Sequence, residues 1–233
     1  MIEKTLKTTT GKITIRMPVS LNEITLSQMM KLQEKPELND LEVINILSGI
    51  SLKQLQNVLC MDDFHPFADV ILSLSEQVKG LYNNDAVPKK ITFQLNNATK
   101  TINVIQNLSV EPAGAFMAAR DIISDEINKH ITQNGQDNWE ICFNPSLKAC
   151  CQVLAHYFYC RVTGKLYNEY EAQEFCTEIK KLRVTEALPV AKHFFTCYPN
   201  LSKQKTNFFQ YLLHRLRKRP ASRHLKNLNI SIP

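Results

Sequence analysis

The chain has 233 residues, of which 44% are hydrophobic and 21% are charged; this composition is typical of a globular protein and excludes a largely disordered one. The formal net charge of +6 is unevenly divided: residues 1–200 carry 20 Lys and Arg against 22 acids, or −2, and residues 201–233 carry the other 8 and no acid, or +8. A uniformly basic surface built for polyanions is therefore excluded, and the sequence predicts a near-neutral body with one basic end.

Hydropathy and cysteine usage indicate a cytosolic protein. No apolar run approaches the ~18 residues of a membrane span, and residues 1–10 (MIEKTLKTTT) lack the apolar centre of a signal peptide. We therefore expect no membrane contact. The seven cysteines are odd in number and irregularly spaced, which favours reduced thiols over a disulfide framework.

The first 88 residues predict a β-hairpin followed by four helices. In residues 4–17 (KTLKTTTGKITIRM), apolar and polar residues alternate on both sides of a Thr/Gly turn. Capping boxes at Thr25–Gln28 and Ser51–Gln54 mark two helix starts, and Pro66 fits the first turn of another helix. The predicted helices cover residues 22–34, 40–50, 51–59 and 64–78.

Residues 89–200 repeat this order. Residues 89–105 (KKITFQLNNATKTINVI) predict a second hairpin, and a helix over 107–127 is expected to use Ser109 as its cap and Pro112 in its first turn. Pro189 is expected in the first turn of the last helix, as Pro66 is in the first half. The remaining helices are predicted at 145–162, 168–182 and 184–198. The last of them has an apolar stripe at helical spacing, formed by Ala187, Leu188, Ala191, Phe194, Phe195 and Tyr198.

The sequence thus predicts an α+β fold, mainly helical, made of two tandem copies of a β-hairpin followed by about four helices. The expected domains are the first hairpin-helix repeat (1–88), the second repeat (89–200), and a basic C-terminal helix and arm (201–233). An alternative stays open at this point: an α+β chain can show the same order of elements without an internal duplication.

No catalytic motif is present, so we expect a protein that is not an enzyme and that uses no cofactor. Phosphate-binding loops, HExxH, CxxC and GxSxG are all missing. His156 and Cys160 could meet one metal ion from a single helical turn, but two ligands fall short of the four of a structural zinc site. Lys148, Gln152 and His156 instead predict the wetter side of a buried helix, and we expect no metal.

The basic end predicts a contact with an anionic partner. A helix over 202–218 would end in RLRKR before Pro220, and one or two such cations would suffice to offset its dipole. The excess favours nucleic-acid phosphate or an acidic face of a neighbouring subunit. The predicted contact residues are Lys203, Lys205, Arg215, Arg217, Lys218, Arg219, Arg223 and Lys226. The alternating apolar residues that follow predict an arm that docks as an added strand, through Leu225, Leu228, Ile230 and Ile232.

The order of these pieces resembles a group of tailed-bacteriophage proteins described as tail-assembly chaperone-like or as virion proteins. A hairpin followed by LNEITLSQMMKL and an ILSGIS helix break is similar to the opening of that group. Residues 151–195 are similar to its second half, with a buried helix, a YNE helix start and a short helix ending in paired Phe. The resemblance covers residues 10–200, while the basic tail and apolar end depart from it.

The resemblance implies a non-enzymatic bacteriophage structural or assembly protein, belonging to the head, neck or tail of the virion or acting as an assembly factor. Its expected partners are other phage structural proteins, further copies of itself, and DNA through the C-terminal tail. Its expected location is the bacterial host cytoplasm during assembly, followed by retention in the virion. The alternatives are a DNA-binding accessory protein that uses the basic tail and an enzyme of unrecognised type.

Overall fold

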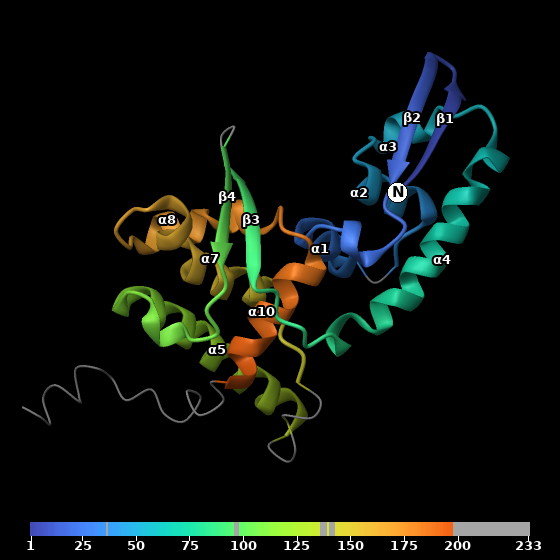
Figure 1. The fold of residues 1–233 in the computed structure, drawn as a ribbon. Helices are drawn as coiled ribbons and strands as arrows, with labels where there is room; N and C mark the ends of the chain where they lie inside the picture. The colour runs from blue at the N-terminus through green and yellow to red at the C-terminus, as the bar shows by residue number, and fades with distance from the viewer. Residues whose placement is uncertain (36, 96–97, 136–138, 140–142, 198–233) are drawn as a thin grey trace, which may run out of the picture. The chain divides into compact units, whose positions relative to one another are not determined.

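A computed structural model of the chain describes residues 1–35, 37–95, 98–135, 139 and 143–197. These residues all belong to the compact unit Met1–Ser202. The fold is α+β and mainly helical, as predicted (Figure 1). Among the described residues, no helix is both long and apolar enough to cross a bilayer.

The predicted first hairpin is confirmed. Strands β1 (Ile2–Thr8) and β2 (Gly11–Met17) pair antiparallel with Thr5 opposite Thr14, and the hydroxyls of these two threonines lie 3.0 Å apart on the exposed face. Leu6, Ile15 and Met17 are buried, because successive side chains of a strand point to opposite faces.

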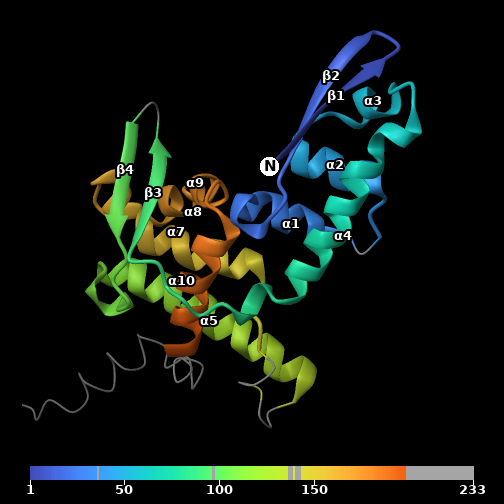
Figure 2. The ribbon, with the colours of Figure 1, turned by 45° about the vertical axis from the view of Figure 1, so that its right-hand side comes forward.

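Four α-helices follow the first hairpin: α1 (Leu26–Glu34), α2 (Asp40–Ser48), α3 (Leu52–Gln56) and α4 (His65–Lys79). Both predicted capping boxes form, at Thr25–Gln28 and Ser51–Gln54. A third box that the sequence analysis did not name, Asn39–Glu42, begins α2. Figures 1 and 2 show the first hairpin beside α2 and α3.

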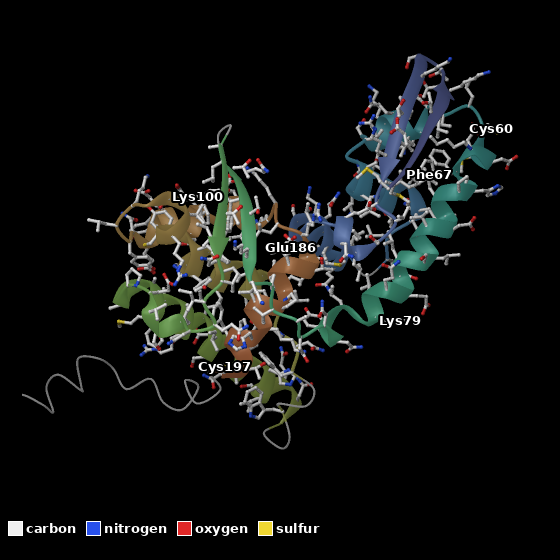
Figure 3. The ribbon with its side chains drawn as sticks, viewed as in Figure 1. Cys60, Phe67, Lys79, Lys100, Glu186 and Cys197 are labelled. Atoms are coloured by element: carbon white, nitrogen blue, oxygen red, sulfur yellow. The ribbon has the colours of Figure 1, made fainter. Side chains whose placement is uncertain are left out.

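The second hairpin is formed by β3 (Lys90–Leu95) and β4 (Ala98–Asn103). It is followed by α5 (Ala113–Asn134), α7 (Leu147–Thr163), α8 (Glu169–Glu174), α9 (Cys176–Ile179) and α10 (Val184–Cys197). Lys100 on β4, labelled in Figure 3, donates to the carbonyl of Val162 on α7 at 2.6 Å. The hairpin is thereby fixed to the end of α7.

Three local predictions are wrong in the second half. Ser109 lies in a short 3-10 helix and Pro112 is the N-cap of α5, so the helix begins after the proline. Pro189 lies inside α10, not in its first turn, since α10 begins at Val184. The helix predicted over 168–182 is divided into α8 and α9 at Phe175.

Helix α7 is the centre of the second half, and 12 of its 17 residues are buried. Its two longest neighbours are α5 and α10, which pack along it. Aromatic rings fill the space between the elements: Phe158 meets Phe93 of β3 edge-on at 5.1 Å between centroids, and Tyr157 lies 4.8 Å from Phe194 of α10. The edge-to-face pair of Phe93 and Phe158 stabilises beyond the area that it buries.

The two hairpin-led halves are joined where α1 and α10 begin. The Leu26 N–H donates to the Leu182 carbonyl at 2.8 Å, and the Val184 N–H donates to the Ile24 carbonyl at 2.9 Å. Next to this junction lies a cavity of about 310 Å³, lined among others by Leu21, Gln77 and Pro189. Each half places a hairpin before its helices, while descent of the halves from one duplicated unit stays a prediction.

Candidate interaction site

The contact residues predicted in the C-terminal tail lie outside the described residues. These are the cations Lys203, Lys205, Arg215, Arg217, Lys218, Arg219, Arg223 and Lys226, and the apolar arm Leu225, Leu228, Ile230 and Ile232. Within the described residues, the most fully organised exposed feature is the turn from α7 to α8. We call residues 164–174 the α7–α8 corner.

The corner begins with a helix end that needs glycine. Gly164 has φ +72° and its N–H donates to the Cys160 carbonyl at 2.8 Å, which is the left-handed helix end that glycine favours. The Thr163 hydroxyl accepts from the Lys165 N–H at 3.2 Å and donates to the Tyr159 carbonyl at 2.7 Å. The chain direction after α7 is therefore set by hydrogen bonds.

Tyr167 anchors the middle of the corner against the body. Its hydroxyl lies 2.9 Å from Nδ1 of His156 on α7. Its ring lies against Gly114 of α5, so closely that a Cβ on Gly114 would come within 2.7 Å of two ring carbons. Only glycine leaves room for the ring at that point, so the first turn of α5 and the corner are fitted to each other.

The hydrogen bond between Tyr167 and His156 is placed in a desolvated environment. Burial lowers the pKa of His156 against the opposing effect of Glu169, and burial followed by Glu169 and Cys160 raises the pKa of Tyr167 to about 12. A neutral imidazole that accepts at Nδ1 from the Tyr167 hydroxyl fits both shifts. Of the stripe predicted on the wetter side of α7, Lys148 is exposed and Gln152 is partly exposed. The expectation is wrong for His156, which contacts Tyr167 and is only 6% exposed.

A second set of contacts fixes the start of α8. Asn168 caps the helix through the N–H groups of Tyr170 and Glu171. The Glu171 carboxylate accepts from the Tyr159 hydroxyl and from the Lys165 ammonium, each at 2.6 Å. The Lys165 ammonium and then the Tyr159 hydroxyl lower the pKa of Glu171, so this carboxylate stays charged.

These contacts leave two large apolar side chains in solvent. Leu166 is 93% exposed and Tyr170 is 81% exposed, although the residues next to them are held by the body. The exposed carboxylates Glu169 and Glu174 belong to the same corner. An apolar pair on a pre-ordered loop can bind a protein surface at low entropic cost, and tyrosine is among the residues that contribute most to such contacts.

Chemically reactive groups also meet at the end of α10. The Cys197 sulfur lies 3.6 Å from Nδ1 and 3.4 Å from Nε2 of His193, and His193 Nε2 lies 3.2 Å from the Gln106 carbonyl. Cys197 is exposed and His193 is partly exposed, and the described residues contain no group of three or more His, Cys, Asp or Glu arranged to hold a metal ion.

Comparisons of the chain with protein-family models, with curated proteins and with solved structures found no match. The inferences that follow accordingly use the chain's own residues and the order of its elements.

Sequence reasoning did not identify the α7–α8 corner as an interaction site. From the sequence alone, Gly164 fits a helix stop and the acids of 169–174 fit complements to a helix dipole, and the structure agrees with both. The available signal was the placement of Leu166 and Tyr170 beside those polar residues. Their exposure could not be foreseen, because it depends on Tyr167 being the residue that turns inward.

Proposed function

We propose that the protein is a non-enzymatic bacteriophage structural or assembly protein whose body binds a neighbouring protein subunit through the α7–α8 corner. The observation that carries the proposal of a protein contact is the exposure of Leu166 and Tyr170 on a loop that hydrogen bonds hold in place. The assignment to a phage particle rests on the resemblance in the order of elements described above.

The corner has the properties of a contact site more than those of an ordinary surface. Single exposed apolar residues are common on soluble proteins. Here the two most exposed large apolar residues among the described ones lie four positions apart on one corner. The neighbouring backbone is fixed by Tyr167, Asn168 and Glu171, so the free protein already presents the pair in one arrangement.

We infer that the bound subunit is a second copy of this chain. The exposed acids Glu169 and Glu174 beside the corner favour a partner with basic charge. The chain itself combines a body of net charge −2 with a C-terminal segment of +8, so the basic segment of one copy supplies the charge that Glu169 and Glu174 of another copy would attract. Repeated contacts between identical copies are how rings and closed assemblies form.

A DNA-binding accessory protein is the second candidate, because eight Lys and Arg and no acid lie in residues 201–233. That function predicts DNA binding that weakens as salt rises, with log K falling by up to ~0.9 per phosphate neutralised for each decade of salt. It requires no role for Leu166 or Tyr170. The two candidates therefore differ in which residues they need.

The test uses the full chain and two variants of it. Leu166→Ser with Tyr170→Ser removes the apolar pair, and Arg217→Gln with Lys218→Gln and Arg219→Gln removes part of the basic segment. We expect the first variant to lose self-association while keeping the circular dichroism and melting temperature of the wild type. Self-association that survives in this variant would refute the proposed role of the corner.

A further inference from the structure

Two cysteines from different helices meet in the second half. Cys151 of α7 is 2% exposed, whereas Cys176 at the start of α9 is partly exposed. The Cys151 sulfur lies 3.6 Å from the Cys176 carbonyl oxygen, and the Cys176 sulfur lies 3.9 Å from the Cys151 carbonyl oxygen. Each sulfur thus reaches the backbone of the other residue, so the two side chains lie side by side between the helices.

The two thiols differ in acidity. A hydrogen bond from the Cys151 thiol lowers the pKa of Cys176, and the ammonium of Lys180 adds to this effect. The same hydrogen bond, together with burial, raises the pKa of Cys151. Cys176 is therefore the sulfur that ionises first, and it is also the one that a solute can reach.

We propose that Cys151 and Cys176 form a redox-active dithiol that hydrogen peroxide converts to a disulfide between α7 and α9. The Cys176 thiolate attacks one peroxide oxygen and displaces hydroxide, which leaves a sulfenic acid on Cys176. The Cys151 sulfur then attacks the Cys176 sulfur, the S–OH bond breaks, and water leaves. The two thiols lose two electrons and two protons, and one peroxide is reduced to two waters.

The other described cysteines lack this arrangement. Cys150 is fully buried, burial raises its pKa, and its sulfur lies 4.0 Å from the Pro145 carbonyl. Burial also raises the pKa of Cys160. Cys60 and Cys197 are exposed and are labelled in Figure 3. They can be oxidised as single thiols, and so they report how much oxidant has reacted.

The dithiol proposal does not depend on the proposed function. The geometry that carries it lies inside the second half and involves neither the apolar pair of the corner nor the basic segment. A disulfide here would close a short loop that contains the whole corner, residues 164–174, and so would restrict its unfolding. Failure of one proposal leaves the other unchanged.

The experiment treats the reduced full-length protein with hydrogen peroxide, blocks the remaining thiols with iodoacetamide, and maps the tryptic peptides by mass spectrometry. Cleavage at lysine and arginine places Cys151 in peptide 149–161 and Cys176 in peptide 166–180. We expect a disulfide-linked pair of these peptides that has lost two hydrogen atoms and that dithiothreitol separates. Fragmentation of the linked pair identifies Cys151 as the bonded sulfur.

Matched variants separate the proposed pair from its neighbours. Cys151→Ser and Cys176→Ser are expected to abolish the linked peptides, whereas Cys150→Ser, one residue away on the same helix, is expected to keep them. Reaction of Cys176 is expected to be about tenfold slower in Lys180→Gln if the ammonium activates the thiolate. The wild type alone can also refute the proposal: it is wrong if peroxide oxidises Cys60 fully while no link between 149–161 and 166–180 forms, or if fragmentation places the link on Cys150 or Cys160.

Discussion

At Gly114, one missing side chain decides how the corner meets the body. The Tyr167 ring occupies the space where a Cβ would stand, and the Tyr167 hydroxyl is held by His156. The ring cannot move aside without losing that hydrogen bond. Gly114 therefore acts through Tyr167 on the position of both exposed residues of the corner.

Replacing Gly114 by alanine is expected to lower the free energy of unfolding by about 1–3 kcal/mol, which is the usual cost of overpacking. Urea denaturation of both proteins measures this difference in the free energy of unfolding. Gly80→Ala is the matched control, because its Cβ would lie 3.6 Å from the nearest atom, the Gln77 carbonyl oxygen. A Gly114 variant as stable as the Gly80 variant would show that Tyr167 does not pack as described.

His156 is expected to make stability depend on pH. Its pKa is lowered in the folded protein, mainly by burial, so below the unfolded pKa of ~6.5 the unfolded chain binds a proton that the folded chain does not. The contribution of this residue is complete above that pH and is lost as pH falls toward the folded pKa. The protonated ring carries a hydrogen on Nδ1, so it cannot accept a hydrogen bond from the Tyr167 hydroxyl there.

The measurement compares unfolding free energies near neutral pH and at about pH 5, in the range where histidine titrates. The wild type is expected to lose stability over this range, and His156→Gln is expected to lose less. His65→Gln, at an exposed position of α4, serves as the control and should follow the wild type. If the unfolding free energies of wild type and His156→Gln fell equally with pH, the account of this residue would be contradicted.

At the scale of elements, a buried ion pair ties the start of α5 to α7. Glu111 accepts from Arg161, and the Glu111 side chain is only 3% exposed against 19% for Arg161. The guanidinium carbon of Arg161 lies 5.0 Å from the centroid of the Tyr157 ring, and its Nη1 donates to the Asn103 carbonyl at 3.5 Å. Removing one partner of such a pair leaves a poorly hydrated charge behind.

Glu111→Ala is therefore expected to lower the free energy of unfolding by about 2–4 kcal/mol. This loss lies below the upper range for buried pairs because Arg161 retains some contact with water. Glu3→Ala breaks the exposed pair with Arg16, whose side chains are 52% and 67% exposed, and should cost at most about 1 kcal/mol. Thermal or urea unfolding of both variants gives the comparison. Equal costs would mean that the Arg161 pair is as weakly coupled as a surface pair.

Most elements could be predicted from the sequence because their signals are local. The alternation in residues 4–17 and the boxes at Thr25 and Ser51 specify a hairpin and two helix starts within a few residues. The bounds predicted for the last helix, 184–198, begin where α10 begins. Only the placement of Pro189 in the first turn is wrong, because it follows the parallel with Pro66 of the first half. The hydrogen bond from the Val184 N–H to the Ile24 carbonyl, by contrast, joins residues far apart in sequence, and no local pattern contains it.

In the α7–α8 corner, too, some features can be predicted from the sequence and others cannot. Gly164 predicts the end of α7 from the sequence alone. Which of Leu166, Tyr167 and Tyr170 turns inward depends on Gly114 and His156, 53 and 11 residues away from Tyr167 in the chain. The exposed pair could therefore be found only in the folded structure.

At the scale of the whole molecule, the proposed function assigns protein contact to the body and treats DNA contact by the basic segment as the competing account. Contacts between copies should weaken only modestly as salt rises, because salt screens the attraction of Glu169 and Glu174 for the basic segment but not the apolar contact of Leu166 and Tyr170, whereas a contact with nucleic-acid phosphate weakens steeply. The body's charge of −2 does not favour DNA. Salt dependence and the response to substitutions at the corner therefore separate the two accounts.

Sedimentation velocity of the full chain, with and without a short DNA duplex and at low and moderate salt, tests the central claim most directly. We predict self-association without DNA that persists at moderate salt, disappears in Leu166→Ser with Tyr170→Ser, and does not depend on the duplex. A wild-type monomer that binds the duplex only at low salt, loses it in the Arg217, Lys218 and Arg219 variant, and is unaffected by the corner substitutions would contradict the proposal and establish the DNA-binding account.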